Sequence, residues 1–195
     1  MQLMQYFDPP TIDKQILRKA KISDIEIIPI EPHENATPQN YLNNVKNYIH
    51  LYGGQIQLGW IFLIMGNLAL KLTAHAVVKR GDDSLLCVTP NEYRNNKLRF
   101  SPDDSIECLI KNNFLPMKFI PLIQNSTLNE YLDIERDMDE LRLENSGVVK
   151  SIDIQLMHLK ASALYPSILE LAKKHTHKND FCFCGSNKKR KKCCG

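Results

Sequence analysis

The sequence predicts an α+β fold that ends in a small metal-binding motif. Its first half carries one amphipathic helical pattern followed by several strand-forming runs, its second half turns helical, and its last fourteen residues hold four cysteines. With 195 residues and 43% hydrophobic content, the chain is long enough for an ordinary core. We expect an α+β domain over residues 1–125, a helical segment over 126–177 and a zinc knuckle over 178–195.

The first half is expected to contain one helix, with one strand before it and four strands after it. Residues 1–36 carry several prolines and a few isoleucines, which favour an irregular lead-in with one strand. Thr37 followed by Pro38 is a helix-start signal, and apolar residues at helical spacing continue as far as Gly53. Gly66 and Asn67 predict a turn between two runs of strand-forming residues. The strands expected after this helix span residues 55–64, 69–79, 85–89 and 97–100.

The second half is expected to be helical. Thr127 and Glu130 have the spacing of a capping box and open a helix that runs to about Asn145. Residues 153–174 form either two helices, the second beginning at Pro166, or one helix kinked there. Basic residues at 173–175 suit a helix C-terminus because they interact favourably with its dipole. A short hinge at Asn179-Asp180 is then expected to lead into the knuckle.

A cytoplasmic location is expected, because Cys87 and Cys108 lie far apart in the sequence and buried free cysteines are common in reducing compartments. The N-terminus lacks the features of a signal peptide, and the most apolar window, residues 61–72, is too short to cross a bilayer and is expected in the core. The net charge is +3, but residues 178–195 hold six basic and one acidic side chain, so the rest sums to about −2. Nucleic-acid binding by the body is therefore not expected. The acidic doublets, among them those containing Asp103 and Asp139, are expected on the solvated surface.

The terminal cysteines have the spacing C-x-C-x8-C-C, with a basic run between the pairs. Four thiolates can close a tetrahedral structural zinc site, and nearby cations favour the deprotonated thiols that bind metal. Because the segment offers almost nothing apolar to bury, a metal ion is expected to fold it. A disordered basic tail with disulfide-bonded cysteines is the alternative. The expected ligands of one structural Zn²⁺ are Cys182, Cys184, Cys193 and Cys194.

These residues resemble the SEC-C motif, the zinc-binding tail of the translocase ATPase SecA. The opening Cys182-Phe-Cys184-Gly-Ser, the basic middle and the closing Cys193-Cys194-Gly195 stand in the family's order. Where SecA usually has histidine as its last ligand this chain has Cys194, and Asn187 replaces a frequent glycine at a left-handed turn position. The resemblance implies a non-catalytic protein that presents the knuckle to a ribosome or a SecB-like chaperone. The residues expected to contact the partner are Lys188, Lys189, Arg190, Lys191 and Lys192.

The sequence is compatible with two other functions. The body is weakly similar to an uncharacterised bacterial domain found beside SEC-C motifs, with an element order reminiscent of papain-like or transglutaminase-like folds. The helix cysteine of those relatives corresponds to Tyr41, so His75 lacks its usual partner, and strand alternation places His75 outside the core. A thiol hydrolase would have to use His75 with Cys87. The third function is weak RNA binding by the basic tail.

Overall fold

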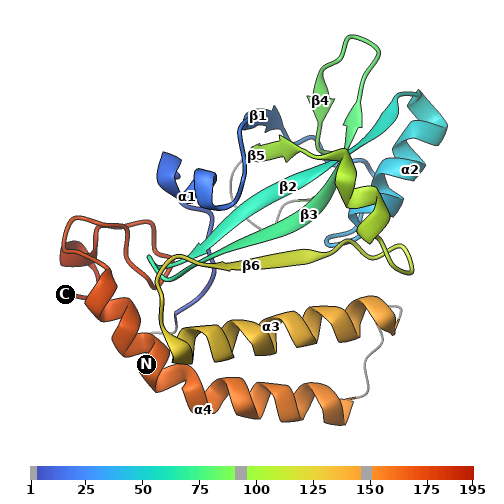
Figure 1. Ribbon diagram of the computed structural model, residues 1–195. Coiled ribbons are helices and arrows are strands. Elements are labelled where there is room, and N and C mark those ends of the chain that lie inside the picture. Colours follow the sequence, from blue (N-terminus) through green and yellow to red (C-terminus); the bar gives the residue numbers. More distant parts are fainter. Residues whose placement is uncertain (1–3, 91–95, 146–150) are drawn as a thin grey trace. The chain divides into compact units, whose positions relative to one another are not determined.

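The computed structural model describes residues 4–90, 96–145 and 151–195 and confirms the α+β class (Figure 1). The α-helices in these ranges are α1 (Lys14–Lys19), α2 (Tyr41–Tyr52), α3 (Ser126–Glu144) and α4 (Ser151–His175). The strands are β1 (Glu26–Pro29), β2 (Gln55–Met65), β3 (Ala69–Lys79), β4 (Leu85–Leu86), β5 (Lys97–Pro102) and β6 (Met117–Pro121). Two 3-10 helices, η1 (Asp104–Leu109) and η2 (Arg190–Lys192), complete the elements.

The strands form one sheet in the order β1-β5-β2-β3-β4, with β6 paired to β3. Antiparallel registers place Ile28 opposite Leu98 and Trp60 opposite Ser101. Gly59 lies where β2 meets β5, and a Cβ atom there would come within 2.3 Å of the Phe100 ring and 2.4 Å of the Ser101 carbonyl oxygen. Glycine at this position therefore lets the two strands pair closely.

The chain forms two compact units, each assembled from segments far apart in the sequence. Unit 1 comprises Met1–Ser23, Phe62–Leu72 and Met117–Gly195, and unit 2 comprises Asp24–Ile61 and Thr73–Pro116. The long strands β2 and β3 contribute residues to both units. The predicted division of the chain into consecutive segments 1–125, 126–177 and 178–195 stays a prediction.

Unit 1 is built around helices α3 and α4. Asn125 is the N-cap of α3, and its side-chain oxygen accepts a hydrogen bond from the Leu128 N–H at 3.0 Å, so the capping box predicted from Thr127 is wrong. Helix α4 runs unbroken through Pro166, which decides for one helix over two. The buried core of this unit is Met4, Met65, Leu68, Ala69, Phe119, Leu128, Leu132, Ile168, Ala172, Cys182 and Phe183.

Unit 2 carries helix α2, which begins three residues later than its start signal suggests. The buried side chain of Asn44 accepts a hydrogen bond from the Thr37 N–H and donates one to the Thr37 carbonyl, at 3.1 and 2.7 Å. Its amide also donates to the Thr89 hydroxyl at 3.0 Å. Gln39 has a positive φ of 63°, which lies outside the right-handed helical region, so α2 starts after it at Tyr41.

Two acidic side chains are more enclosed than the sequence suggests. Asp103 accepts hydrogen bonds from the Trp60 indole at 2.7 Å and from the Ser105 N–H at 3.0 Å, where it caps η1. Asp139 is 8% exposed and accepts a hydrogen bond from the Met117 N–H at 2.8 Å. The expectation of a solvated position is wrong for Asp139, which is buried, whereas Asp103 is half-buried and keeps contact with solvent.

The apolar window at residues 61–72 lies in β2, β3 and their connecting turn, and most of its side chains are buried, as expected. Across the described part of the chain, none of the helices has the length and apolar character needed to cross a membrane.

Candidate metal centre

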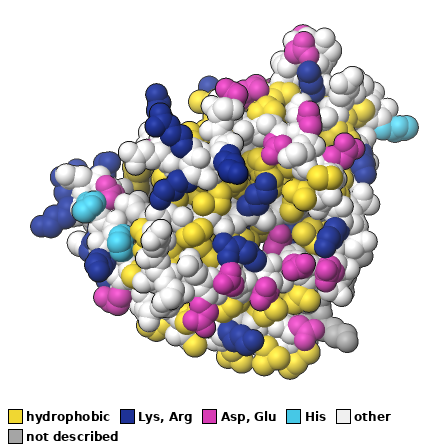
Figure 2. All heavy atoms as spheres, viewed as in Figure 1, with side chains coloured by type: hydrophobic (Ala, Val, Ile, Leu, Met, Phe, Trp, Pro, Cys, Tyr) yellow, Lys and Arg dark blue, Asp and Glu magenta, His cyan; other side chains and the backbone are white. Residues whose placement is uncertain are grey.

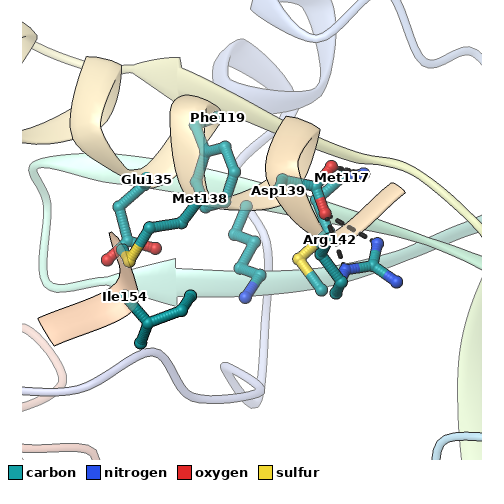
Figure 3. Close-up of a pocket in the computed structure, with 8 residues that line it drawn as sticks. Met117, Phe119, Glu135, Met138, Asp139, Arg142 and Ile154 are labelled. Atoms are coloured by element: carbon teal, nitrogen blue, oxygen red, sulfur yellow. Dashed lines mark hydrogen bonds and ion pairs between the residues drawn. The ribbon is translucent and has the colours of Figure 1, made fainter. Parts of the chain in front are cut away.

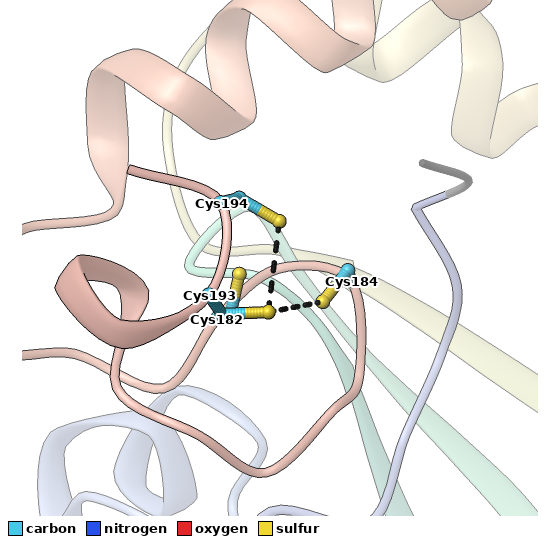
Figure 4. A group of neighbouring side chains, drawn as sticks. All are labelled: Cys182, Cys184, Cys193 and Cys194. Carbon is cyan, nitrogen blue, oxygen red and sulfur yellow. Dashed lines mark hydrogen bonds between the residues drawn. The ribbon is translucent and has the colours of Figure 1, made fainter. Parts of the chain in front are cut away.

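The four terminal cysteines converge on one point (Figure 4). Their sulfur atoms all lie within 4.8 Å of one another, with Cys184 and Cys193 3.4 Å apart and Cys193 and Cys194 3.9 Å apart. A tetrahedral Zn²⁺ with bonds of about 2.3 Å to sulfur separates its ligands by about 3.8 Å, whereas a disulfide brings two sulfurs to about 2.05 Å. All six cysteines of the chain lie in the described ranges as free thiols. The cluster could therefore hold a metal ion.

A compact hairpin brings the two cysteine pairs together. Gly185 and Asn187 adopt left-handed φ angles of 74° and 57°, which confirms the conformation expected of Asn187. The chain then returns so that the Cys182 N–H donates to the Lys188 carbonyl at 2.8 Å. Helix η2 follows, and the Cys193 N–H donates to the Arg190 carbonyl at 2.9 Å. The basic run is thus the return arm that carries the second cysteine pair to the first.

Within the knuckle, residues 181–195 pack on the core of unit 1. Phe183 is 2% exposed and belongs to that core together with the fully buried Cys182. A Cβ atom on Gly66, at the turn between β2 and β3, would lie 3.1 Å from the Cβ of Phe183. The expectation that this segment has almost nothing apolar to bury is therefore wrong, because the buried Phe183 ring anchors it.

The expected hinge before the knuckle is also anchored. The Asp180 carboxylate accepts hydrogen bonds from the Asn67 amide at 2.8 Å and from the His177 N–H at 2.7 Å. The Asn67 amide donates in addition to the His175 carbonyl at 3.0 Å. These bonds tie the end of α4 to the turn between β2 and β3, so residues 179 and 180 form a fixed connection.

The five basic residues of the return arm divide into two groups. Lys188, Lys189, Lys191 and Lys192 are exposed, and Lys and Arg side chains gather at this end of the unit in Figure 2. Arg190 points inward, where its guanidinium donates to the carbonyls of Lys173 and Thr176 and, at 2.9 Å, to that of Gly195. Arg190 thereby satisfies carbonyls at the C-terminus of α4, which lack partners within the helix.

The thiols of the cluster differ in acidity. Burial acts to raise the pKa of Cys184, but hydrogen bonds from Ser186 and the neighbouring thiols outweigh it and lower that pKa to about 6. Burial raises the pKa values of Cys182 and Cys194. One thiolate surrounded by hydrogen-bonding thiols is a suitable starting point for a metal, whose charge then favours loss of the remaining protons.

Comparison of the chain with protein-family models, with curated proteins and with solved structures gives no significant match to any of them. The resemblance to the SEC-C motif thus stays a prediction. The case for a metal site comes from the arrangement of the four cysteines.

The second candidate pair, His75 and Cys87, meets inside unit 2. The His75 Nε2 atom lies 3.2 Å from the Cys87 sulfur, and the side chains are 3% and 2% exposed. The prediction that His75 lies outside the core is wrong, because the Tyr41 ring of α2 covers that face of β3, with its centroid 4.3 Å from the imidazole centroid. Strand alternation separates the two faces of a strand but does not show what covers each one.

Burial opposes catalysis by this pair. It lowers the pKa of His75 to about 3 and raises that of Cys87 to about 11, so the pair exists near neutral pH as a thiol beside an uncharged imidazole. Nucleophilic catalysis needs the thiolate and a route for the substrate. With both side chains almost fully enclosed, the arrangement has the properties of a core contact.

A third site is a pocket of about 380 Å³ in unit 1, lined by β3, β6, α3 and α4 (Figure 3). It combines apolar walls with four charged side chains, of which Asp139 and Arg142 form an ion pair at 2.6 Å. The sequence signal for this pocket is a lysine near the start of a strand in which most side chains are apolar. The residues that line the pocket are Lys71, Met117, Phe119, Glu135, Met138, Asp139, Arg142 and Ile154.

The ammonium group of Lys71 is poorly solvated in this pocket. It lies 5.4 Å from the ring centroids of both Tyr6 and Phe119, and burial lowers its pKa. Burial likewise raises the pKa of the nearby Glu135 carboxyl. Both shifts oppose the charged forms, which indicates that burying the charges of Lys71 and Glu135 lowers the free energy of unfolding.

Lys71→Met is therefore expected to raise the midpoint of thermal unfolding by about 2–4 °C, since methionine can pack on the same two rings without a charge to desolvate. Lys97→Met, at an exposed strand position, is the matched control and should leave the midpoint nearly unchanged. A fall in the midpoint of the Lys71 variant, measured by circular dichroism, would show that the attraction between Lys71, the rings and Glu135 exceeds the cost of burial.

Proposed function

We propose that Cys182, Cys184, Cys193 and Cys194 bind one structural Zn²⁺, and that the metal-bound knuckle is a contact surface for a protein or ribosomal partner. The observation that carries the first part is the convergence of four sulfur atoms within 4.8 Å of one another. A four-thiolate zinc site has no open coordination position, so its role is to hold shape. The surrounding cations offset the negative charge that four thiolates leave around a divalent ion.

The second part is supported by the distribution of charge on the return arm. We assign partner contact to the exposed residues Lys188, Lys189, Lys191 and Lys192, and we assign Arg190 to docking because its guanidinium is engaged with backbone carbonyls. A cluster of lysines fixed on a rigid loop favours a partner with an acidic surface. The ribosome and a SecB-like chaperone are the partners that the resemblance to SEC-C implies.

Metal binding is tested by elemental analysis of the protein purified under reducing conditions. We expect one zinc per chain, lost on treatment with a strong chelator and in Cys184→Ser. The exposed Cys108 lies outside the cluster, so Cys108→Ser should retain full zinc content. A metal-free protein that fails to take up added zinc would overturn the proposal, and iron in place of zinc would correct the identity of the metal.

Partner contact is tested by capture from a lysate with the zinc-loaded chain. Changing the four exposed lysines of the return arm to glutamine should remove ribosome or SecB-like chaperone enrichment while zinc content is retained. The matched control removes the same charge from four exposed lysines elsewhere, Lys14, Lys97, Lys111 and Lys118. Equal capture by both variants would contradict the assignment. Binding of ribosome-free RNA with a steep salt dependence would instead favour the weak RNA-binding alternative.

A further inference from the structure

Helix α4 carries an exposed apolar stripe along its first half. Ile152, Leu156 and Leu159 are 57%, 51% and 67% exposed, although side chains of this kind are usually buried. Their spacing of four and then three residues places them on one side of the helix, and the exposed Ala163 continues the line. This is the spacing with which one helix packs lengthwise against another.

We propose that this stripe pairs with the same stripe of a second copy of the chain, with the two α4 helices antiparallel about a two-fold axis near Leu156. In that arrangement Leu156 meets its own counterpart, and Ile152 of each copy lies opposite Leu159 of the other. Ile152, Leu156 and Leu159 thus each receive an apolar partner from an identical surface, as a closed dimer requires.

The charges beside the stripe fit this partner. At 100° per residue, Asp153 and Lys160 fall on the same flank of the stripe, each about a quarter turn from its centre. In an antiparallel pair, equivalent flanks of the two helices face each other. A two-fold axis near Leu156 therefore places Asp153 of each copy opposite Lys160 of the other, which gives two symmetric attractive pairs.

The other flank is compatible with the same arrangement. It carries Gln155 and Ser162, which are uncharged and oppose no like charge. A parallel pair would instead bring the flank with Asp153 and Lys160 against this uncharged one, and both ion pairs would be lost. Charge complementarity thus favours the antiparallel orientation of the two helices over the parallel one. Because the stripe is short, the dimer is expected to be weak and concentration-dependent.

Sedimentation of the full zinc-loaded chain tests the proposal. We expect the wild-type mass to rise with concentration from 22.5 kDa toward twice that value. Leu156→Glu should remain monomeric at every concentration, with an unchanged helical signal in circular dichroism. A wild-type chain that stays monomeric, or an association that Leu156→Glu leaves unaltered, would overturn the proposal.

Charge reversal tests the register. Asp153→Lys alone and Lys160→Asp alone should each be monomeric, because each places like charges opposite one another. An equimolar mixture of the two variants should associate again, since one chain then presents two lysines and the other two aspartates. Recovery on mixing cannot come from repaired folding of either chain. The control pair Glu34→Lys and Lys97→Asp in unit 2 should associate like wild type, and failure of the mixture to associate would overturn the antiparallel register.

Discussion

Replacing Phe183 with alanine is expected to lower the free energy of unfolding of unit 1 by about 3–5 kcal/mol. The side chain is 2% exposed and joins a core drawn from β2, β3, β6, α3 and α4. Alanine would leave a cavity there and remove the only phenylalanine of the knuckle that is fully enclosed. Chemical denaturation of the zinc-loaded protein, followed by circular dichroism, measures the loss.

Phe181 provides the matched control for this experiment. It is two residues away on the other side of Cys182, but it is partly exposed, and its ring lies under the Lys189 ammonium at 4.4 Å. Phe181→Ala should cost only about 0.5–1 kcal/mol. Equal losses in the two variants would mean that docking of the knuckle does not depend on the buried ring. We also expect Phe183→Ala to bind zinc more weakly, because the hairpin that carries the ligands loses its support.

Acidification is expected to destabilise unit 2 through His75. Its pKa in the folded protein is about 3, below the ordinary value of 6.5, so between these values the unfolded chain binds a proton that the folded chain does not. The stability from neutral His75 is complete above pH 6.5 and falls as the pH decreases toward 3. The loss attributable to this residue is about 2 kcal/mol by pH 5.

Denaturation at pH 7 and pH 5 in two variants isolates this contribution. His75→Gln replaces the imidazole with a neutral side chain that can also hydrogen-bond with the Cys87 thiol, and it should remove about 2 kcal/mol of the difference between the two pH values. His50→Gln, at an exposed position on α2, should leave the wild-type difference intact. An unchanged pH dependence in His75→Gln would place the acid sensitivity in other groups.

The long elements of the fold could be predicted from the sequence because each carries its own local signal. Strands β2 and β3 were predicted to within one residue, since two long runs of strand-forming residues flank Gly66-Asn67. Strand β6 was missed because it is short and owes its place to pairing with β3 and to the carboxylate of Asp139. Such partners are distant in sequence and leave no local pattern.

The candidate site shows the same division. Convergence of the four cysteines could be anticipated from their spacing, because two thiol pairs separated by a short basic segment are typical of a metal site in a chain with reduced thiols. The inward direction of Arg190 could not, since a run of five basic residues gives no sign of which one faces carbonyls of α4. The contact between His75 and Cys87 was considered from the strand order, but its burial depends on Tyr41, which lies 34 residues earlier in the chain.

The discontinuous make-up of unit 1 also has a consequence for biosynthesis. Met65, Leu68 and Ala69 leave the ribosome more than a hundred residues before Phe183, which completes their surroundings. During translation these side chains remain exposed to solvent until residues 181–195 can pack on them. Contacts between residues so far apart in the sequence also form slowly. This part of the core is therefore expected to stay incomplete until residues 181–195 have been synthesised.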